Sequence, residues 1–341
     1  MNRHDNPPEG LTGRQLRLAA LKQFHWRAGI RHQIVDPDID GLLSAALAYR
    51  VFGWPIVGFY DTEALWLDSR LETPLDLSTV AWVDLDMTWP GTRSIGQHVT
   101  NVSWHKPAPA TWHSVNPSLL RGIRQTRDYK WKYPFGTFQW LWWVLNLSKG
   151  EAQLDDPVGR GLAWLPDGGH VSYSTRDGKF APNLDHWRST ILPGFLLDAS
   201  DERINPDAAH EEANLAAAHL KERSGVASGW DKEQWRMAAQ RGTYGSGWPE
   251  IKDDEINRLL EAICEFYGWP LPPTPDKYTT FRGLWNRSDK AGSLQFPDHQ
   301  LIVSLSATGH EKCRWTSAER GVSHAGGLPS LAEALGTPLA T

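Results

Sequence analysis

Residues 31–51 read RHQIVDPDIDGLLSAALAYRV, and this stretch decides the fold class. Its first six residues contain Ile34 and Val35 and end in an acid, Asp36, which predicts a short β-strand. In its last eleven residues, apolar side chains recur at helical spacing and no proline interrupts them, which predicts a helix. Between the two, Asp36, Asp38 and Asp40 alternate along the chain. An extended backbone places such alternate side chains on one side.

Two further apolar stretches, residues 55–60 and 79–84, also have the character of strands. The second is almost continuously apolar, as is typical of strands buried on both faces, and it too ends in an acid, Asp84. A strand, a helix and two more strands in this order predict an α/β fold, a parallel sheet with helices on both faces. Ligands of such sheets bind beyond the carboxyl ends of the strands, so both groups of acids should reach the binding edge.

The composition of the 341-residue chain narrows its class further. Thirty-five Lys and Arg against 40 Asp and Glu give a net charge of -5, which excludes a protein that coats nucleic acid by charge alone. Two cysteines exclude a disulfide scaffold and a Cys-based zinc finger. The first residues lack the apolar core of a signal peptide, and no window approaches about 20 uninterrupted apolar residues. We therefore expect a cytoplasmic protein without a membrane partner.

The length of the chain favours about two domains. We expect an α/β domain over residues 14–190, a helical connector over residues 195–268 and a smaller α/β domain over residues 276–341. The connector contains the clearest helical patterns, at residues 211–223 and 250–266. A proline-rich turn follows it and separates it from the last domain.

The alternating acids predict a metal site. Crowded carboxylates repel one another unless a cation neutralises them, and Mg²⁺ and Mn²⁺ prefer oxygen ligands. The simpler alternative is a helix N-cap followed by solvated acids of a loop. A second pair of acids, Asp84 and Asp86, ends a separate buried strand, and this favours the metal interpretation.

Six short motifs follow one another between residues 30 and 175: Asp38-Ile-Asp40-Gly41, Asp84, Ile95-Gly-Gln-His98-Val, Asn116-Pro117, Tyr133-Pro-Phe135 and Asp167. This order resembles the DHH phosphoesterase superfamily, which includes RecJ-like single-strand exonucleases, oligoribonucleases, cyclic-dinucleotide phosphodiesterases and family II pyrophosphatases. The third motif takes the place of the Asp-His-His that names the family.

The resemblance implies a centre that binds one or two Mn²⁺ or Mg²⁺ ions and hydrolyses phosphate esters. Within it, Asp84 would bridge two ions, and His98 would bind a metal or contact the scissile phosphate. Asp84 and His98 are thus the implied catalytic residues. The implied metal ligands are Asp36, Asp38, Asp40, Asp84, His98 and Asp167.

The chain departs from the family pattern at both histidine motifs. The family's metal-binding His four residues before Asp38 is Ile34 here, and Asp36 is placed to substitute for it. If His98 matches the second His of the third motif, Gln97 replaces a metal ligand; if the alignment slips by one residue, His98 is that ligand. Two later histidines are further candidates for the missing one: His105 and His113. Full activity with altered ligands, activity with one metal and an inactive scaffold all remain open.

A basic stretch interleaved with aromatic residues follows the acid motifs. It contains Arg121, Arg124, Arg127, Lys130 and Lys132, with Trp131 and Tyr133 between and after them. If the stretch is helical, its arginines share one face. Such a surface suits single-stranded nucleic acid, whereas the alternative is an ordinary solvated face. The resemblance adds a glycine-rich substrate loop, loosely matched by residues 321–327. The candidate substrate-binding residues are therefore Arg121, Arg124, Lys130, His324, Gly326 and Gly327.

Two functions of different classes follow from these patterns. The first is a metal-dependent phosphoesterase that hydrolyses phosphodiester bonds in single-stranded nucleic acid or a short oligonucleotide. The second is a catalytically impaired protein of the same fold that binds nucleic acid, a nucleotide or protein partners within a larger assembly. The preserved acids favour the first function, and the altered third motif favours the second. Phosphatase activity on pyrophosphate or small nucleotides is a third, weaker alternative.

Overall fold

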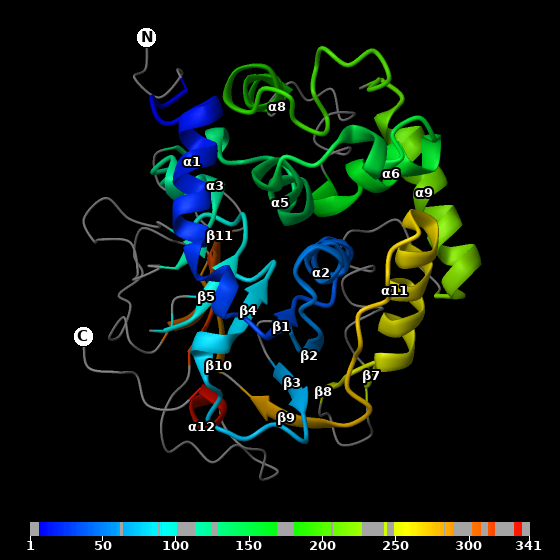
Figure 1. Ribbon diagram of the computed structural model, residues 1–341. Coiled ribbons are helices and arrows are strands. Elements are labelled where there is room, and N and C mark those ends of the chain that lie inside the picture. Colours follow the sequence, from blue (N-terminus) through cyan, green and yellow to red (C-terminus); the bar gives the residue numbers. More distant parts are fainter. Residues whose placement is uncertain are drawn as a thin grey trace.

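The computed structural model describes residues 7–61, 64–87, 89, 91–100, 113–124, 128–168, 181–205, 207–226, 242–243, 249–282, 284–288, 302–307, 313–317 and 331–335. A mixed, mostly parallel sheet of seven strands forms its centre, and helices flank this sheet (Figure 1). The α/β class predicted from the sequence is confirmed. Among the residues described, no helix combines the length and apolarity that a membrane crossing requires.

The seven strands lie in the order β6-β5-β4-β1-β2-β3-β9. Their bounds are β1 His32–Val35, β2 Ile56–Tyr60, β3 Ala64–Asp68, β4 Val80–Val83, β5 Arg93–Ile95, β6 Ser114–Val115 and β9 Tyr278–Arg282. The strands from β6 to β2 run parallel, whereas β3 pairs antiparallel with both β2 and β9. The last residues of β1 and β4, Val35 and Val83, are paired. Whatever follows these two strands therefore begins at the same point of the sheet edge.

Side chains of the central strands alternate between two apolar cores. Val35 and Val83 belong to the larger core, and Ile34 and Trp82 belong to the smaller core on the other face of the sheet. Gln33 faces the larger core, where its Nε2 donates to the carbonyl oxygens of Ala45 (3.1 Å) and Trp54 (2.7 Å). Because both faces are covered, the strands carry the nearly continuous apolar runs seen in the sequence.

Most of the described helices pack into the larger core. The longer ones are α1 Gly13–Gln23, α2 Ile39–Phe52, α5 Thr137–Leu145, α6 Pro157–Trp164, α9 Ala209–Ser224 and α11 Asp253–Tyr267. Helix α2 packs against β1 and β4, and also against α5 and α11 (Figure 1). Helix α9 packs against α6 and α11. The tryptophans of α5, Trp140, Trp142 and Trp143, are buried in this core.

The shorter elements connect this framework. They are η1 Phe24–Gly29, η2 Leu77–Thr79, α3 Pro117–Leu120, η3 Tyr129–Trp131, η4 Lys149–Ala152, η5 Pro166–Gly168, α8 Ala181–His186, η6 Trp187–Ile191, β7 Gly242–Thr243 and β8 Pro249–Glu250. Three of the predicted helices, α2, α9 and α11, start two or three residues away from the predicted position. Helix α2 begins before residue 41 because Asp38 caps it. Helix α11 begins at Asp253, where three acids in its first turn suit the positive end of the helix dipole.

Part of the predicted C-terminal domain returns to the first sheet. Strand β9 pairs with β3, and the short helix α12 (Leu331–Leu335) packs into the smaller core, where Leu75 N–H donates to the carbonyl oxygen of Ala334 (2.8 Å). A separate antiparallel sheet has the order β10-β12-β11. Its strands are β10 Leu284–Ser288, β11 Ile302–Ala307 and β12 Cys313–Ser317. The boundary at residue 276 stays a prediction.

Candidate functional site

Three carboxylates converge where β1 and β4 end. Asp36 follows β1, Asp84 follows β4, and Asp38 is the N-cap of α2. One ligand oxygen from each lies within 4.8 Å of the others. The pairing of the two strands continues past their ends, since Asp36 N–H donates to the carbonyl oxygen of Val83 (3.2 Å). The sheet register therefore brings together acids that are 48 residues apart in the sequence.

The turn from β1 into α2 needs the glycine of the motif. Asp38 accepts a hydrogen bond from Gly41 N–H (2.9 Å), which starts the helix. A Cβ atom at position 41 would lie 1.9 Å from the carbonyl oxygen of Asp36. The helix therefore begins so tightly against the strand end that a side chain at position 41 does not fit. This close approach holds Asp36 and Asp38 beside each other.

Asp40, in the first turn of α2, caps a different helix. Its Oδ2 accepts from Thr137 N–H (2.7 Å) and its Oδ1 accepts from Phe138 N–H (2.9 Å), so both oxygens face the N-terminus of α5. Gly136 precedes α5 and has no side chain to cap it, and a Cβ there would lie 2.5 Å from Asp40 Oδ2. Asp40 thus supplies from α2 the acceptors that the start of α5 lacks.

Asp84 is hydrogen-bonded to the same helix, α5. The hydroxyl of Thr137 donates to Asp84 Oδ1 (2.6 Å), so one residue of α5 contacts both Asp40 and Asp84. The backbone of Asp84 has a positive φ of 60°, a conformation that aspartate tolerates better than most side chains. Asp167, in η5, has a positive φ of 50° as well. Both acids therefore sit at sharp turns that follow buried elements.

Electrostatic effects show that five acids share one site, which we call the acid cluster: Asp36, Asp38, Asp40, Asp84 and Asp167. Burial raises the pKa of Asp84 well above its ordinary value, and the charges of the other four acids raise it further. Burial likewise raises the pKa of Asp40, followed by the charges of Asp167 and Asp38, although the N–H groups of Phe138 and Thr137 act in the opposite direction. The cluster therefore either keeps a proton or, when fully ionised, needs a cation to offset its charge.

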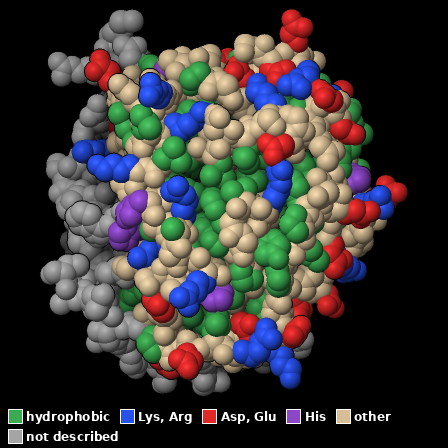
Figure 2. Space-filling view, viewed as in Figure 1, with side chains coloured by type: hydrophobic (Ala, Val, Ile, Leu, Met, Phe, Trp, Pro, Cys, Tyr) green, Lys and Arg blue, Asp and Glu red, His purple; other side chains and the backbone are tan. Residues whose placement is uncertain are grey.

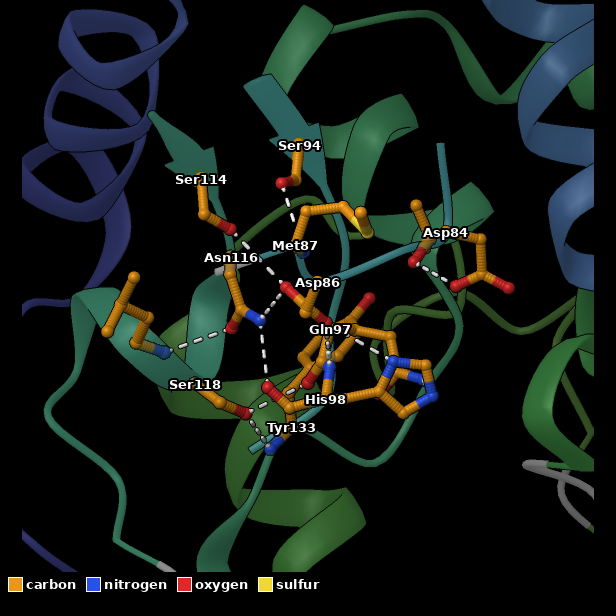
Figure 3. Close-up of polar contacts among 12 residues, drawn as sticks. Asp84, Asp86, Met87, Ser94, Gln97, His98, Ser114, Asn116, Ser118 and Tyr133 are labelled. Carbon is orange, nitrogen blue, oxygen red and sulfur yellow. Dashed lines mark hydrogen bonds and ion pairs between the residues drawn. The ribbon is translucent and has the colours of Figure 1, made fainter. Parts of the chain in front are cut away.

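Asp86 forms a second polar group, which we call the Asp86 network (Figure 3). Its carboxylate accepts from His98 N–H (2.9 Å), His98 Nδ1 (3.2 Å), Asn116 Nδ2 (2.6 Å) and Ser114 Oγ (3.3 Å). Asn116 also donates to the carbonyl oxygen of His98 (2.8 Å) and caps α3 by accepting from Leu119 N–H (3.0 Å). The network therefore fixes the backbone and the ring of His98.

Gln97 and His98 join this network to the acid cluster. Gln97 Nε2 donates to Asp167 Oδ2 and lies 3.3 Å from His98 Nε2. Gln97 is fully buried, and its Oε1 has no hydrogen-bond partner. The implied ligand His98 thus borders the cluster through Gln97. Its Nδ1 faces Asp86, and its Nε2 faces the Gln97 amide.

Tyr133 also belongs to the site, although the sequence assigned it no role there. Its hydroxyl donates to the carbonyl oxygen of Gly136 (3.3 Å), and Asp40 and Asp167 add to the effect of burial in raising its pKa. Asp86 was predicted only as a member of the second pair of acids, without a role of its own. The available signal was that Tyr133 stands in the Tyr-Pro-Phe turn before α5 and that Asp86 lies two residues beyond Asp84.

The basic stretch divides into structural and accessible side chains. Helix α3 ends at Leu120, so the helical face expected for Arg121 and Arg124 does not form. Arg121 is buried over the Trp187 ring (5.4 Å) and donates to the carbonyl oxygens of Pro8 (2.8 Å) and Leu11. Arg124 and Lys130 are partly exposed. On the face of the molecule drawn in Figure 2, the described Lys and Arg side chains are scattered around an apolar centre and form no single basic patch.

One predicted candidate, His113, does not reach the site. His113 lies at the amino end of β6, with its ring 6.2 Å from that of His25, and thus away from the acid cluster at the carboxyl edge. Five others lie outside the described residues: His105, Arg127, His324, Gly326 and Gly327. Their roles stay predictions.

The donor set of the acid cluster fits a hard divalent cation. Asp36, Asp38 and Asp84 offer carboxylate oxygens that already converge within 4.8 Å, and such oxygens are the ligands that Mg²⁺ and Mn²⁺ prefer. A cation there would also offset the charge repulsion that raises the pKa of Asp84. Comparison of the chain with protein-family models, characterised proteins and solved structures found no match.

Proposed function

We propose that the protein is a Mn²⁺- or Mg²⁺-dependent phosphoesterase that hydrolyses phosphodiester bonds in single-stranded or short nucleic acid. The observation that carries this proposal is the convergence of Asp36, Asp38 and Asp84 at the carboxyl edge of the sheet. This edge is where ligands of open α/β sheets bind. A bound ion of this kind lowers the pKa of a water molecule and offsets the charge of a phosphate group.

The surrounding residues have positioning roles in this proposal. Thr137 holds Asp84 through a hydrogen bond (2.6 Å) and thereby fixes one ligand oxygen relative to α5. The ring of His98 is held between Asp86 and Gln97, with a side chain that is 16% exposed. Both ring nitrogens of His98 thus face protein groups, so His98 is a positioning residue that orients Gln97 beside the acid cluster.

The segment between Asn116 and Tyr133 supports a nucleic-acid substrate. Both of its ends are anchored at the site, because Asn116 contacts Asp86 and Tyr133 contacts Gly136. Between them lie the partly exposed Lys130 and the partly buried Trp131, with the ammonium group 5.5 Å from the centre of the ring. Basic and aromatic side chains together suit the backbone and the bases of a single strand.

The test is an assay of hydrolysis with Mn²⁺ and with Mg²⁺ on single-stranded DNA, single-stranded RNA, dinucleotides and pyrophosphate. Wild type should hydrolyse at least one phosphodiester substrate, and Asp84→Ala should lose this activity. Asp207→Ala is the matched control, because Asp207 is exposed and lies at the start of α9, away from the cluster. If wild type and Asp84→Ala behave identically on every substrate, the protein is instead a binding scaffold.

A further inference from the structure

We infer that the centre holds a single divalent cation, on Asp36, Asp38 and Asp84, and that Gln97 closes the position where a second cation would sit. This inference rests on the proposed metal site and specifies its stoichiometry. The resemblance allows one or two ions, and the inference selects one. The protein's own donors occupy the other two acids of the cluster, Asp40 and Asp167.

Asp40 is engaged by the protein on both oxygens. Thr137 N–H reaches Oδ2 at 2.7 Å and Phe138 N–H reaches Oδ1 at 2.9 Å, and both donors belong to the fixed first turn of α5. These bonds orient the carboxylate toward the helix. Both oxygens of Asp40 therefore anchor α5. Asp36, Asp38 and Asp84 each have a ligand oxygen within 4.8 Å of the others.

Asp167 is engaged by the amide of Gln97. A carboxylate accepts hydrogen bonds, so the Gln97 amide must turn its nitrogen toward Asp167, as the Nε2 to Oδ2 contact has it. The same nitrogen lies 3.3 Å from His98 Nε2, which accepts its second hydrogen. His98 is then the neutral tautomer with its proton on Nδ1, where Asp86 Oδ2 accepts it at 3.2 Å. The chain of bonds from Asp86 to Asp167 is complete.

This orientation leaves Gln97 unable to bind a cation beside Asp167. An amide nitrogen carries hydrogens and offers no lone pair to a metal, so the Gln97 nitrogen that faces Asp167 cannot coordinate a cation there. The oxygen of the amide, Oε1, is buried and has no partner. A fully buried acceptor left unsatisfied is costly, so the contacts of Nε2 with Asp167 and His98 must hold the amide in this direction.

The experiment counts ions in the full-length protein, with Mn²⁺ alone as the probe. Isothermal titration and electron paramagnetic resonance should give one Mn²⁺ per wild-type chain, without the signal of a spin-coupled pair. Gln97→His should bind two, with a coupled signal, because an imidazole restores a lone pair next to Asp167. Asp167→Asn should still bind one ion, and Asp36→Asn should lose it.

The ion counts test the single-ion inference separately from the proposed function. Two ions in wild type, or a lower count in Asp167→Asn, would overturn the single-ion inference and leave the proposed function standing. No ion in wild type would overturn both. A well-folded Gln97→His that binds one ion would show that Gln97 does not close the second position. If Gln97→His fails to fold, the counts for wild type and Asp167→Asn still decide the stoichiometry.

Discussion

Asp84 and Asp86 both follow strand β4 and are both buried, yet Asp84 lies among other acids in the acid cluster and Asp86 lies among hydrogen-bond donors in the Asp86 network. Asp86 accepts four hydrogen bonds from protein donors. Asp84 accepts one from Thr137, and its pKa is raised by burial and by four neighbouring carboxylates. A buried carboxylate that accepts hydrogen bonds from protein donors stabilises the fold. Crowded carboxylates destabilise the folded state unless a bound cation offsets their charge. The Asp86 network is thus suited to position His98, and the acid cluster is suited to bind a cation.

Substitution of Asp84 should have the largest effect, and it should lower activity while raising the stability of the metal-free protein. Asp84→Asn should reduce phosphodiester hydrolysis by about 10³-fold or more, because loss of a metal ligand removes several kcal/mol of transition-state stabilisation. The same variant should melt at a higher temperature than wild type in the absence of metal, because it removes a charge from the cluster. Steady-state rates and calorimetry with EDTA measure the two effects. A variant that is less stable than wild type without metal would contradict the comparison.

Asp86→Ala should have the opposite effect on stability. It leaves the buried donors of His98, Asn116 and Ser114 without their acceptor, so the free energy of unfolding should fall by about 3 kcal/mol. Urea unfolding monitored by circular dichroism checks this value. An unchanged midpoint would mean that water satisfies these donors and that the network does not position His98.

Gly136→Ala tests the contact between α5 and the cluster. The added methyl group would lie 2.5 Å from both Asp40 Oδ2 and Pro166 Cβ, which should cost about 2 kcal/mol of stability. Gly150→Ala is the matched control, because a Cβ there meets no atom within 4 Å. Thermal unfolding of both variants gives the difference. Equal stabilities would show that Asp40 moves freely and does not anchor α5.

The smallest effect is the pH dependence of the metal-free protein. The pKa values of Asp40 and Asp84 are raised from 3.8, so above that pH the folded state keeps protons that the unfolded chain has released. The free energy of unfolding should therefore fall as the pH rises above 3.8, by about 1 kcal/mol per pH unit. Denaturant titrations with EDTA measure this slope, which Asp84→Asn should flatten. An identical slope in wild type and Asp84→Asn would show that the raised pKa of Asp84 does not cause this pH dependence.

Asp201 serves as a comparison for this measurement, because its pKa is lowered and not raised. A hydrogen bond from Arg203 lowers its pKa, with a further hydrogen bond from Lys149. A lowered pKa stabilises the folded state above the ordinary value of 3.8, and this stability is lost as the pH falls below it. Asp40 and Asp84 thus change the free energy of unfolding above pH 3.8, whereas Asp201 changes it below that pH. One pH titration of stability therefore distinguishes them.

The sequence predicted those parts of the molecule that local patterns determine. Apolar strands that end in acids placed Asp36 and Asp84 at one edge, because parallel strands share that edge. Asp40 was predicted as a ligand, but its contact with α5 joins residues 97 positions apart and has no local signal. Arg121 appeared as a surface arginine because its spacing suggested a helix. Its partners, Pro8 and Leu11, lie more than 100 residues away.

The close fit of Gly136 against Asp40 constrains how the chain can evolve. Position 136 tolerates no side chain while Asp40 occupies its place, and the space at one position depends on the residue at the other. Substitutions here should therefore occur together: a relative with a larger residue at 136 should carry a smaller one at 40 and a change at 166, whose Cβ lies equally close. Such a relative would have exchanged a carboxylate cap on α5 for packing, and its chemistry at this edge would have to depend on the remaining acids.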